Sequence, residues 1–145
     1  MDEALVVETL HEQDSAACVE LWHEAGLTRP WNDPQADFAR AINGPSSTML
    51  GIRAEGTLVA SVMVGHDGHR GWLYYVAVTA SKRRRGLATK LIDASTTWLR
   101  ERGIPKMQLM VRSDNTDVLH FYDYLGFSDD EVVVRSKVIE PTSRD

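Results

Sequence analysis

The stretch WLYYVAVTASKRRRGLAT, residues 72–89, decides the fold of this 145-residue chain. Its first part, Trp72–Thr79, is a run of apolar and aromatic residues, which predicts a strand that is buried on both faces and central in a sheet. A short basic loop at 82–85 follows, and apolar residues then recur at helical spacing from about Gly86 to Arg102. Helix starts leave backbone N–H groups unpaired and carry partial positive charge. This strand–loop–helix unit therefore predicts a phosphate or pyrophosphate site.

The segments on either side predict an α+β domain. Strands are expected at 4–9, 48–54, 57–65, 106–112 and, at the end, Phe127 and 132–139; helices are expected at 15–25, from Pro34 to about residue 43, and at 114–125. An antiparallel meander followed by β-α-β crossovers implies a mixed, largely antiparallel sheet flanked by about four helices. We expect a single domain over residues 1–145.

Composition narrows the function classes. The formal net charge is −5, and a globally acidic protein is a poor general binder of nucleic acid because phosphate repels it. The single cysteine, Cys18, forms no intramolecular disulfide, which favours a reducing compartment. The acidic start Met1-Asp2-Glu3 is unlike a secretory signal, and no apolar run approaches the roughly 18 residues that span a bilayer. We expect a cytoplasmic protein that binds neither nucleic acid nor membrane.

The basic loop has other interpretations. A basic run is most often a solvated surface, and it can be a nucleic-acid patch. Here it lies between an apolar strand and an amphipathic helix in an acidic protein, which favours the phosphate site. A P-loop is excluded because its Gly-Lys-Ser/Thr ending is absent, and a Rossmann fingerprint needs three glycines where this loop has one.

Two ordered motifs carry a family resemblance. Arg83-x-x-Gly86-x-Ala88 resembles the acetyl-CoA-binding motif of the GNAT N-acetyltransferase superfamily, and Val76-Ala77-Val78 before it resembles that family's splayed central strand. Asn115 followed by Phe121-Tyr122-x-x-x-Gly126-Phe127 resembles the family's second signature. The resemblance implies an acetyl-CoA-dependent N-acetyltransferase without a metal. Such an enzyme moves an acetyl group to a primary amine, which attacks the thioester directly in a ternary complex.

The resemblance also implies roles for individual residues. Backbone N–H groups at the helix start would hold the CoA pyrophosphate, and the strand backbone would pair with the pantetheine arm and polarise the thioester carbonyl. Tyr122 resembles the tyrosine that protonates the departing thiolate, although an aromatic core residue is the alternative. Asn115 is explained nearly as well by helix capping. The implied cofactor-binding residues are Val76, Val78, Arg83, Arg84, Arg85, Gly86, Leu87, Ala88, Thr89 and Asn115.

A third similarity concerns the acceptor. The loop RPWNDP at 29–34, together with DGHRG at 67–71, is similar to the small bacterial YpeA-type branch of the superfamily. In this family the first loop borders the acceptor site, which implies Arg29, Trp31 and Asp33 as acceptor-binding candidates, with Tyr74 from the strand. Helix capping by Asp33 and packing of Trp31 under the loop are the alternatives.

The general base has no evident residue. Many relatives place a glutamate on the strand before the asparagine, and Met110, which cannot accept a proton, occupies that position here. The base then lies elsewhere, acts through water, or is not needed; Tyr74 and, less so, His69 are candidates. His66-x-x-His69 with Asp67 lacks a spaced third ligand, so no metal is expected.

Two other functions stay open. The missing glutamate motivates a non-catalytic acyl-CoA-binding module of the same fold. A nucleic-acid or protein-binding domain that uses Lys82–Arg85 is a distant third. The amine acceptor is expected to be a small molecule or a protein amine, and because GNAT relatives often dimerise, a homodimer is one expected assembly state.

Overall fold

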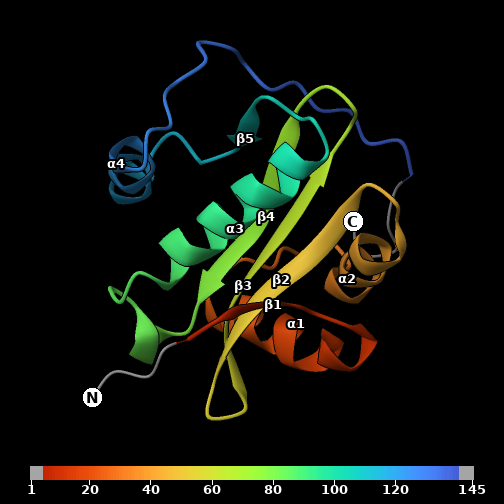
Figure 1. Cartoon of the computed structure of the whole chain (residues 1–145). Helices are drawn as coiled ribbons and strands as arrows, with labels where there is room; N and C mark the ends of the chain where they lie inside the picture. The colour runs from red at the N-terminus through yellow and green to blue at the C-terminus, as the bar shows by residue number, and fades with distance from the viewer. Residues whose placement is uncertain (1–4, 141–145) are drawn as a thin grey trace. The chain divides into compact units, whose positions relative to one another are not determined.

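The computed structural model describes residues 5–140 of a chain that divides into two compact units, Met1–Leu109 and Met110–Asp145. Unit 1 is built on a five-stranded sheet of order β1-β2-β3-β4-β5 (Figure 1). Each adjacent pair among β1, β2, β3 and β4 is antiparallel, and β5 runs parallel to β4. The strands are β1 (Val7–Thr9), β2 (Ser47–Ala54), β3 (Thr57–His66), β4 (Gly71–Val78) and β5 (Met107–Leu109). This is the α+β sheet that the sequence predicts.

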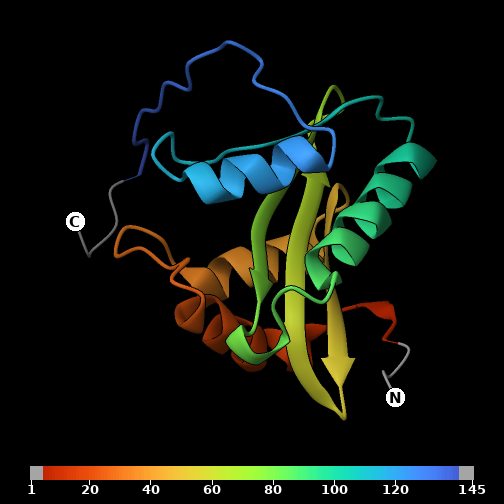
Figure 2. The ribbon, with the colours of Figure 1, turned by 90° about the vertical axis from the view of Figure 1, so that its left-hand side faces the viewer.

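Helices cover both faces of this sheet. Figure 2 shows α1 and α2 on one side of the strands and α3 on the other. Asp33 caps α2 by accepting a hydrogen bond from the Ala36 N–H at 3.1 Å, and Pro34 occupies the first turn, where a missing N–H has no cost. The helices are α1 (Ser15–Glu24), α2 (Pro34–Asn43) and α3 (Leu87–Glu101), with short 3-10 turns η1 (Glu12–Asp14) and η2 (Ala80–Lys82).

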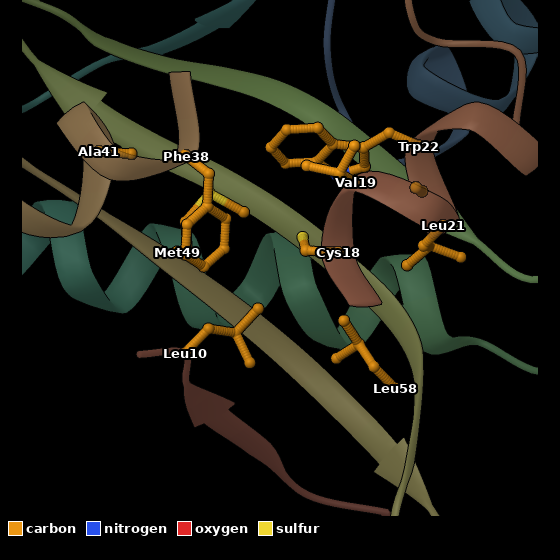
Figure 3. Packing of buried hydrophobic residues seen from close by; sticks show 10 residues of the cluster. Leu10, Cys18, Val19, Leu21, Trp22, Phe38, Ala41, Met49 and Leu58 are labelled. Carbon is orange, nitrogen blue, oxygen red and sulfur yellow. The ribbon is translucent and has the colours of Figure 1, made fainter. Parts of the chain in front are cut away.

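The main core fills the space between α1, α2 and the sheet (Figure 3). Trp22 of α1 is fully buried there, with its ring 6.3 Å from that of Phe38 of α2. Its indole Nε1 donates a hydrogen bond to the buried Ser61 Oγ of β3 at 3.0 Å, so the polar atom of this large side chain is satisfied. The buried members of this cluster are Leu10, Cys18, Val19, Leu21, Trp22, Phe38, Ala41, Met49, Leu58 and Ala77.

Strand β4 pairs with β5 along only the first part of its length. The two strands pair from Gly71 to Leu73, where β5 ends, whereas β4 stays paired with β3 as far as Val78. Within the described sheet, the β5-facing edge of β4 is therefore without a strand partner beyond Leu73. The unpaired edge agrees with the splayed strand that the family resemblance implies.

A bulge interrupts β4 at the same place. Tyr74 lies opposite Met63 and Ala77 lies opposite Ser61, so Tyr75 and Val76 together face a single β3 residue. Tyr75 has a φ of 52°, a left-handed conformation that is uncommon for an aromatic residue. The bulge changes which way the side chains after Tyr74 point.

The prediction that Trp72–Thr79 is buried on both faces is wrong. Leu73 and Ala77 are buried, but Tyr74 is 42% exposed, although β4 does lie inside the sheet between β3 and β5. Beyond the residues paired with β5, Tyr74 lines a cavity instead of core, whereas Tyr75 packs against the core cluster.

Unit 2 contains one helix among its described residues, α4 (Thr116–Tyr124). The predicted final strands at Phe127 and 132–139 are wrong, because residues 125–140 contain no strand and Val132–Val134 are exposed. A β-branched run has strand propensity, but a strand forms only where a neighbouring edge supplies hydrogen bonds. Among residues 5–140, no helix combines the length and apolar character needed to cross a membrane.

Candidate functional site

The loop between β4 and α3 has an unusual backbone. Gly86, the N-cap of α3, has φ 78° and ψ 12°, and Arg84 has φ 64°; Arg85 between them is not in this left-handed region. When successive residues alternate between right-handed and left-handed backbone conformations, their N–H groups point toward one side and form a concave surface that suits an anion. Glycine adopts this conformation without the steric cost that a Cβ imposes, which explains its place in the motif.

The first turn of α3 continues this surface. The first helical hydrogen bond runs from the Lys90 N–H to the Gly86 carbonyl at 3.1 Å, so the N–H groups of Leu87, Ala88 and Thr89 precede it. Leu87 is buried and anchors the turn, while the three arginines before Gly86 are exposed. Free N–H groups, the positive end of the helix dipole and guanidinium groups together suit a pyrophosphate.

The same loop is tied to β4 and to α1. Arg83 Nε donates to the Val78 carbonyl at 3.1 Å, so this side chain turns back onto the strand. The Glu24 carboxylate, at the end of α1, accepts hydrogen bonds from Thr79 Oγ1 at 2.8 Å and from the Ala80 N–H at 3.2 Å. The Ala80 bond is the largest reason that the pKa of Glu24 lies below its ordinary value. Sequence reasoning missed Glu24, since nothing local to it indicates a partner 55 residues away.

The backbone of β4 beyond the bulge is the second part of the candidate site. Val76 and Val78 are half-buried and lie on the stretch of β4 that has left β5. An extended arm can add to such an edge as a further strand would. Val76 and Val78 directly precede the loop at 83–89, and their role in cofactor binding stays a prediction.

A cavity of about 530 Å³ lies in unit 1 between the loop after α1, α2 and the strands β3 and β4. A smaller hollow of about 260 Å³ adjoins it and shares Ser47, Met63 and Tyr74. Burial is the larger reason, and the charge of Asp67 the smaller, that the pKa of the Tyr74 phenol is raised. The lining of the 530 Å³ cavity includes Asn32, Asp37, Arg40, Met63, Tyr74 and Tyr75.

The acceptor candidates fall in different places. Tyr74 lines both hollows. Arg29 Nη1 donates to the Gly26 and Thr28 carbonyls at 2.9 and 2.8 Å, so it holds its own loop. Trp31 is 53% exposed, and Asp33 is engaged as the N-cap of α2. Two other residues near this loop, Asn32 and Asp37, line the cavity instead. Sequence reasoning identified neither of them.

The histidine-containing turn holds itself together. Asp67 Oδ1 accepts hydrogen bonds from the N–H groups of His69 and Arg70, both at 2.8 Å, and the bond from Arg70 is the largest cause of the lowered pKa of Asp67. His66 Nδ1 accepts from the Gly68 N–H at 3.0 Å. Within the described part of the chain, no group of three or more potential ligands could hold a metal ion.

Two of the predicted site residues, Tyr122 and Asn115, lie in unit 2. The Tyr122 ring is buried, with edge contacts to Phe121 and Phe127 at centroid distances of 5.2 and 5.4 Å. Burial raises the pKa of its phenol, so the hydroxyl is a proton donor at neutral pH. Asn115 caps α4 by accepting from the Val118 N–H at 3.4 Å.

A model of the acetyltransferase (GNAT) family matches residues 8–127 of the chain. The chain belongs to this family. An acetyltransferase of Yersinia pestis is 37% identical over 131 residues, which cover 90% of this chain and 93% of the relative. One of Pectobacterium atrosepticum is 38% identical with the same coverage. The similarity to the YpeA-type branch stays a prediction.

A solved structure supports the same fold. The aminoglycoside N-acetyltransferase AAC(6')-Iy, in complex with the bisubstrate analogue CoA-S-monomethyl-acetylneamine, aligns with a TM-score of 0.81 at 18% sequence identity. The alignment covers 94% of this chain and 99% of that one. At this identity the likeness establishes the fold alone. With the family match and the similar acetyltransferases, it makes the chain an N-acetyltransferase of the GNAT family.

Proposed function

We propose that this chain, acting as a single domain, transfers an acetyl group from acetyl-CoA to a primary amine that attacks the thioester directly. The observation that carries the proposal is the splayed, bulged β4 followed at once by the anion-binding loop of Arg84–Thr89. Acetyl-CoA supplies the activated acetyl group. The remaining steps belong to residues of this chain.

The proposed roles follow from the contacts that each group offers. The N–H groups of Arg84–Thr89 bind the pyrophosphate, with Arg84 and Arg85 adding charge. Arg83 holds the loop against Val78, and Val76 and Val78 orient the pantetheine arm through their backbone groups. A β4 N–H stabilises the negative charge that develops on the carbonyl oxygen.

The leaving thiolate needs a proton. We assign this donation to Tyr122, whose phenol is protonated at neutral pH and has its pKa raised further by burial, while Phe121 and Phe127 pack edge-on against its ring. As the C–N bond forms, the amine gives its proton to water; as the C–S bond breaks, the departing thiolate takes the Tyr122 phenol proton, which solvent then restores. Asn115 caps α4 and thereby positions the helix that carries Tyr122.

A second function has one observation in its favour. At the position where many relatives have a glutamate, Met110 follows directly after β5 and offers no carboxylate. A module that binds acyl-CoA without transferring the acetyl group would need none. Acetyl-CoA binding without turnover across a wide panel of primary amines would favour this module over the enzyme.

The thermal midpoint with and without saturating acetyl-CoA tests the proposal. A ligand at 100 times its Kd adds about 2.7 kcal/mol of stability, which for a chain of this size raises the midpoint by roughly 5–10 °C. We expect this rise in the wild type and its loss in a folded Arg84→Glu, Arg85→Glu variant. The matched control is Arg135→Glu, Lys137→Glu, which reverses the same charge at exposed residues outside the loop. A folded wild type that shows no rise contradicts the proposal.

A further inference from the structure

A half-buried carboxylate lies in the 530 Å³ cavity beside β4. Asp37, in the first turn of α2, accepts a hydrogen bond at its Oδ2 from the Tyr75 hydroxyl at 2.8 Å. Its Oδ1 lies 3.4 Å from Arg40 Nη1. A carboxylate has about four lone-pair sites, so two contacts leave acceptor capacity on both oxygens.

Tyr75 is held in place more firmly than an ordinary surface tyrosine. Its ring stacks on Trp22 with a centroid distance of 3.8 Å and an interplanar angle of 10°. Trp22 is in turn fixed by its bond to Ser61, whose hydroxyl also donates to the Tyr75 carbonyl at 3.3 Å. The β4 bulge, with Tyr75 at φ 52°, turns the ring to this position. The hydroxyl therefore meets Asp37 at a fixed point, and the carboxylate is preorganised.

We propose that Asp37 binds the ammonium group of the acceptor before reaction and that Tyr75 is the positioning residue that holds Asp37 for this task. The bound ammonium group gives a proton to water before its nitrogen attacks the thioester. The inference rests on the proposed function, because it names the acceptor class for the same reaction. Arg40 is the competing cation, but its side chain is 77% exposed. Exposed ion pairs of this kind contribute little stability, so an ammonium group that enters the cavity can replace it.

The cavity also limits the size and character of the acceptor. Its volume of about 530 Å³ lies in the range that holds one small molecule rather than a folded chain segment. Met63, Leu27 and the Tyr74 ring supply apolar wall beside the carboxylate. The geometry points to a small primary amine with a compact apolar or aromatic body, in preference to a polypeptide.

Binding of four small primary amines tests the inference: 2-phenylethylamine, tyramine, butylamine and 1,4-diaminobutane. The neutral isostere 2-phenylethanol and an alanine tetrapeptide serve as comparison probes. Affinities are measured by calorimetry on the wild type, on Asp37→Asn and on Asp93→Asn, a control that removes the same charge from the exposed face of α3. We expect at least one amine to bind the wild type and Asp93→Asn equally. We expect Asp37→Asn to bind that amine at least about tenfold more weakly.

Four outcomes overturn the inference. The first is binding of 2-phenylethanol as tight as that of the amines, and the second is equal amine affinity in Asp37→Asn and the wild type. The third is binding of the tetrapeptide but of no small amine, and the fourth is the absence of all amine binding. The acetyl-CoA midpoint shift is recorded for the same samples. If the wild type lacks that shift, the proposed function fails. If the shift is present and Asp37→Asn binds the amines as tightly as the wild type does, only the present inference fails.

The positioning role of Tyr75 has its own readout. Tyr75→Phe keeps the ring that stacks on Trp22 but loses the hydrogen bond to Asp37. We expect it to weaken amine binding several-fold while the acetyl-CoA midpoint shift stays as in the wild type. A purely structural role predicts a lower midpoint with unchanged amine affinity, and that result would remove Tyr75 from acceptor recognition.

Discussion

Replacement of Gly86 tests two roles of the α3 N-cap separately: adoption of a left-handed backbone and, under the proposed function, approach of the pyrophosphate. Gly86 has φ 78°, and a Cβ built on it meets no atom within 4 Å, so the cost of an alanine is backbone strain rather than a clash. That strain is about 1–2 kcal/mol for a left-handed residue other than glycine. The loss of chain freedom in the unfolded state offsets about 0.4–1 kcal/mol of it.

We therefore expect Gly86→Ala to lower the free energy of unfolding by about 0.8 kcal/mol, the middle of the roughly 0–1.6 kcal/mol that these two ranges leave, and the thermal midpoint by roughly 2–3 °C. Asparagine tolerates this conformation better, so Gly86→Asn should cost less. Urea unfolding followed by tryptophan fluorescence gives both values, with the slope of the transition unchanged. If Gly86→Ala is as stable as the wild type, the left-handed N-cap is not required and the reasoning is refuted.

The same variants report on the ligand. The open space beside the Gly86 Cα is where a pyrophosphate would approach the backbone under the proposed function. Both variants should then lose part of the midpoint rise that acetyl-CoA produces, even though their stabilities differ. A full rise in Gly86→Ala would place the pyrophosphate away from this residue.

Two further outcomes follow from buried groups. Burial raises the pKa of Asp14, but hydrogen bonds from the His11 N–H at 2.9 Å and from Arg53 Nη2 at 2.6 Å outweigh it, so the folded-state pKa is lowered. The stability from this carboxylate is complete above about pH 4 and is lost as the pH falls through the lowered pKa; Asp14→Asn should cost about 1.5–3 kcal/mol at pH 7 and less at pH 3. Urea unfolding at both pH values checks this, and equal losses would contradict it. Tyr122→Phe should lower kcat by about 100-fold with little change in the KM for acetyl-CoA; unchanged turnover in steady-state kinetics would end the role of this phenol.

Local patterns predicted most of the helices and strands. The helix expected from about Gly86 to Arg102 spans Leu87–Glu101, because its apolar spacing and its glycine boundaries are properties of adjacent residues. The tight turn between β2 and β3 is likewise a property of adjacent residues, since Glu55 and Gly56 both have positive φ and suit a hairpin.

The residues of the candidate acceptor site were harder to predict from the sequence. The bond between Tyr75 and Asp37 joins residues 38 positions apart, and no spacing rule indicates it. Asp37 is adjacent to the apolar Phe38 in α2 and has the pattern of a solvated helix residue. The β4 bulge depends on register with β3, which a single strand does not encode. Tyr74 is the one acceptor candidate that lines the cavity, because its position on β4 is part of the sheet itself.

The bulge in β4 separates two parts of one strand that have different surroundings. Before Val76 the strand faces a cavity whose other walls come from the loop after α1 and from α2; after it, the strand leads into the loop at 83–89. Under the functions proposed here, the parts that choose the acceptor and the parts that hold acetyl-CoA are encoded in separate segments of the chain. Substitutions at Asn32, Asp37 or Arg40 can then redirect the enzyme to new amines while the donor side is inherited unchanged.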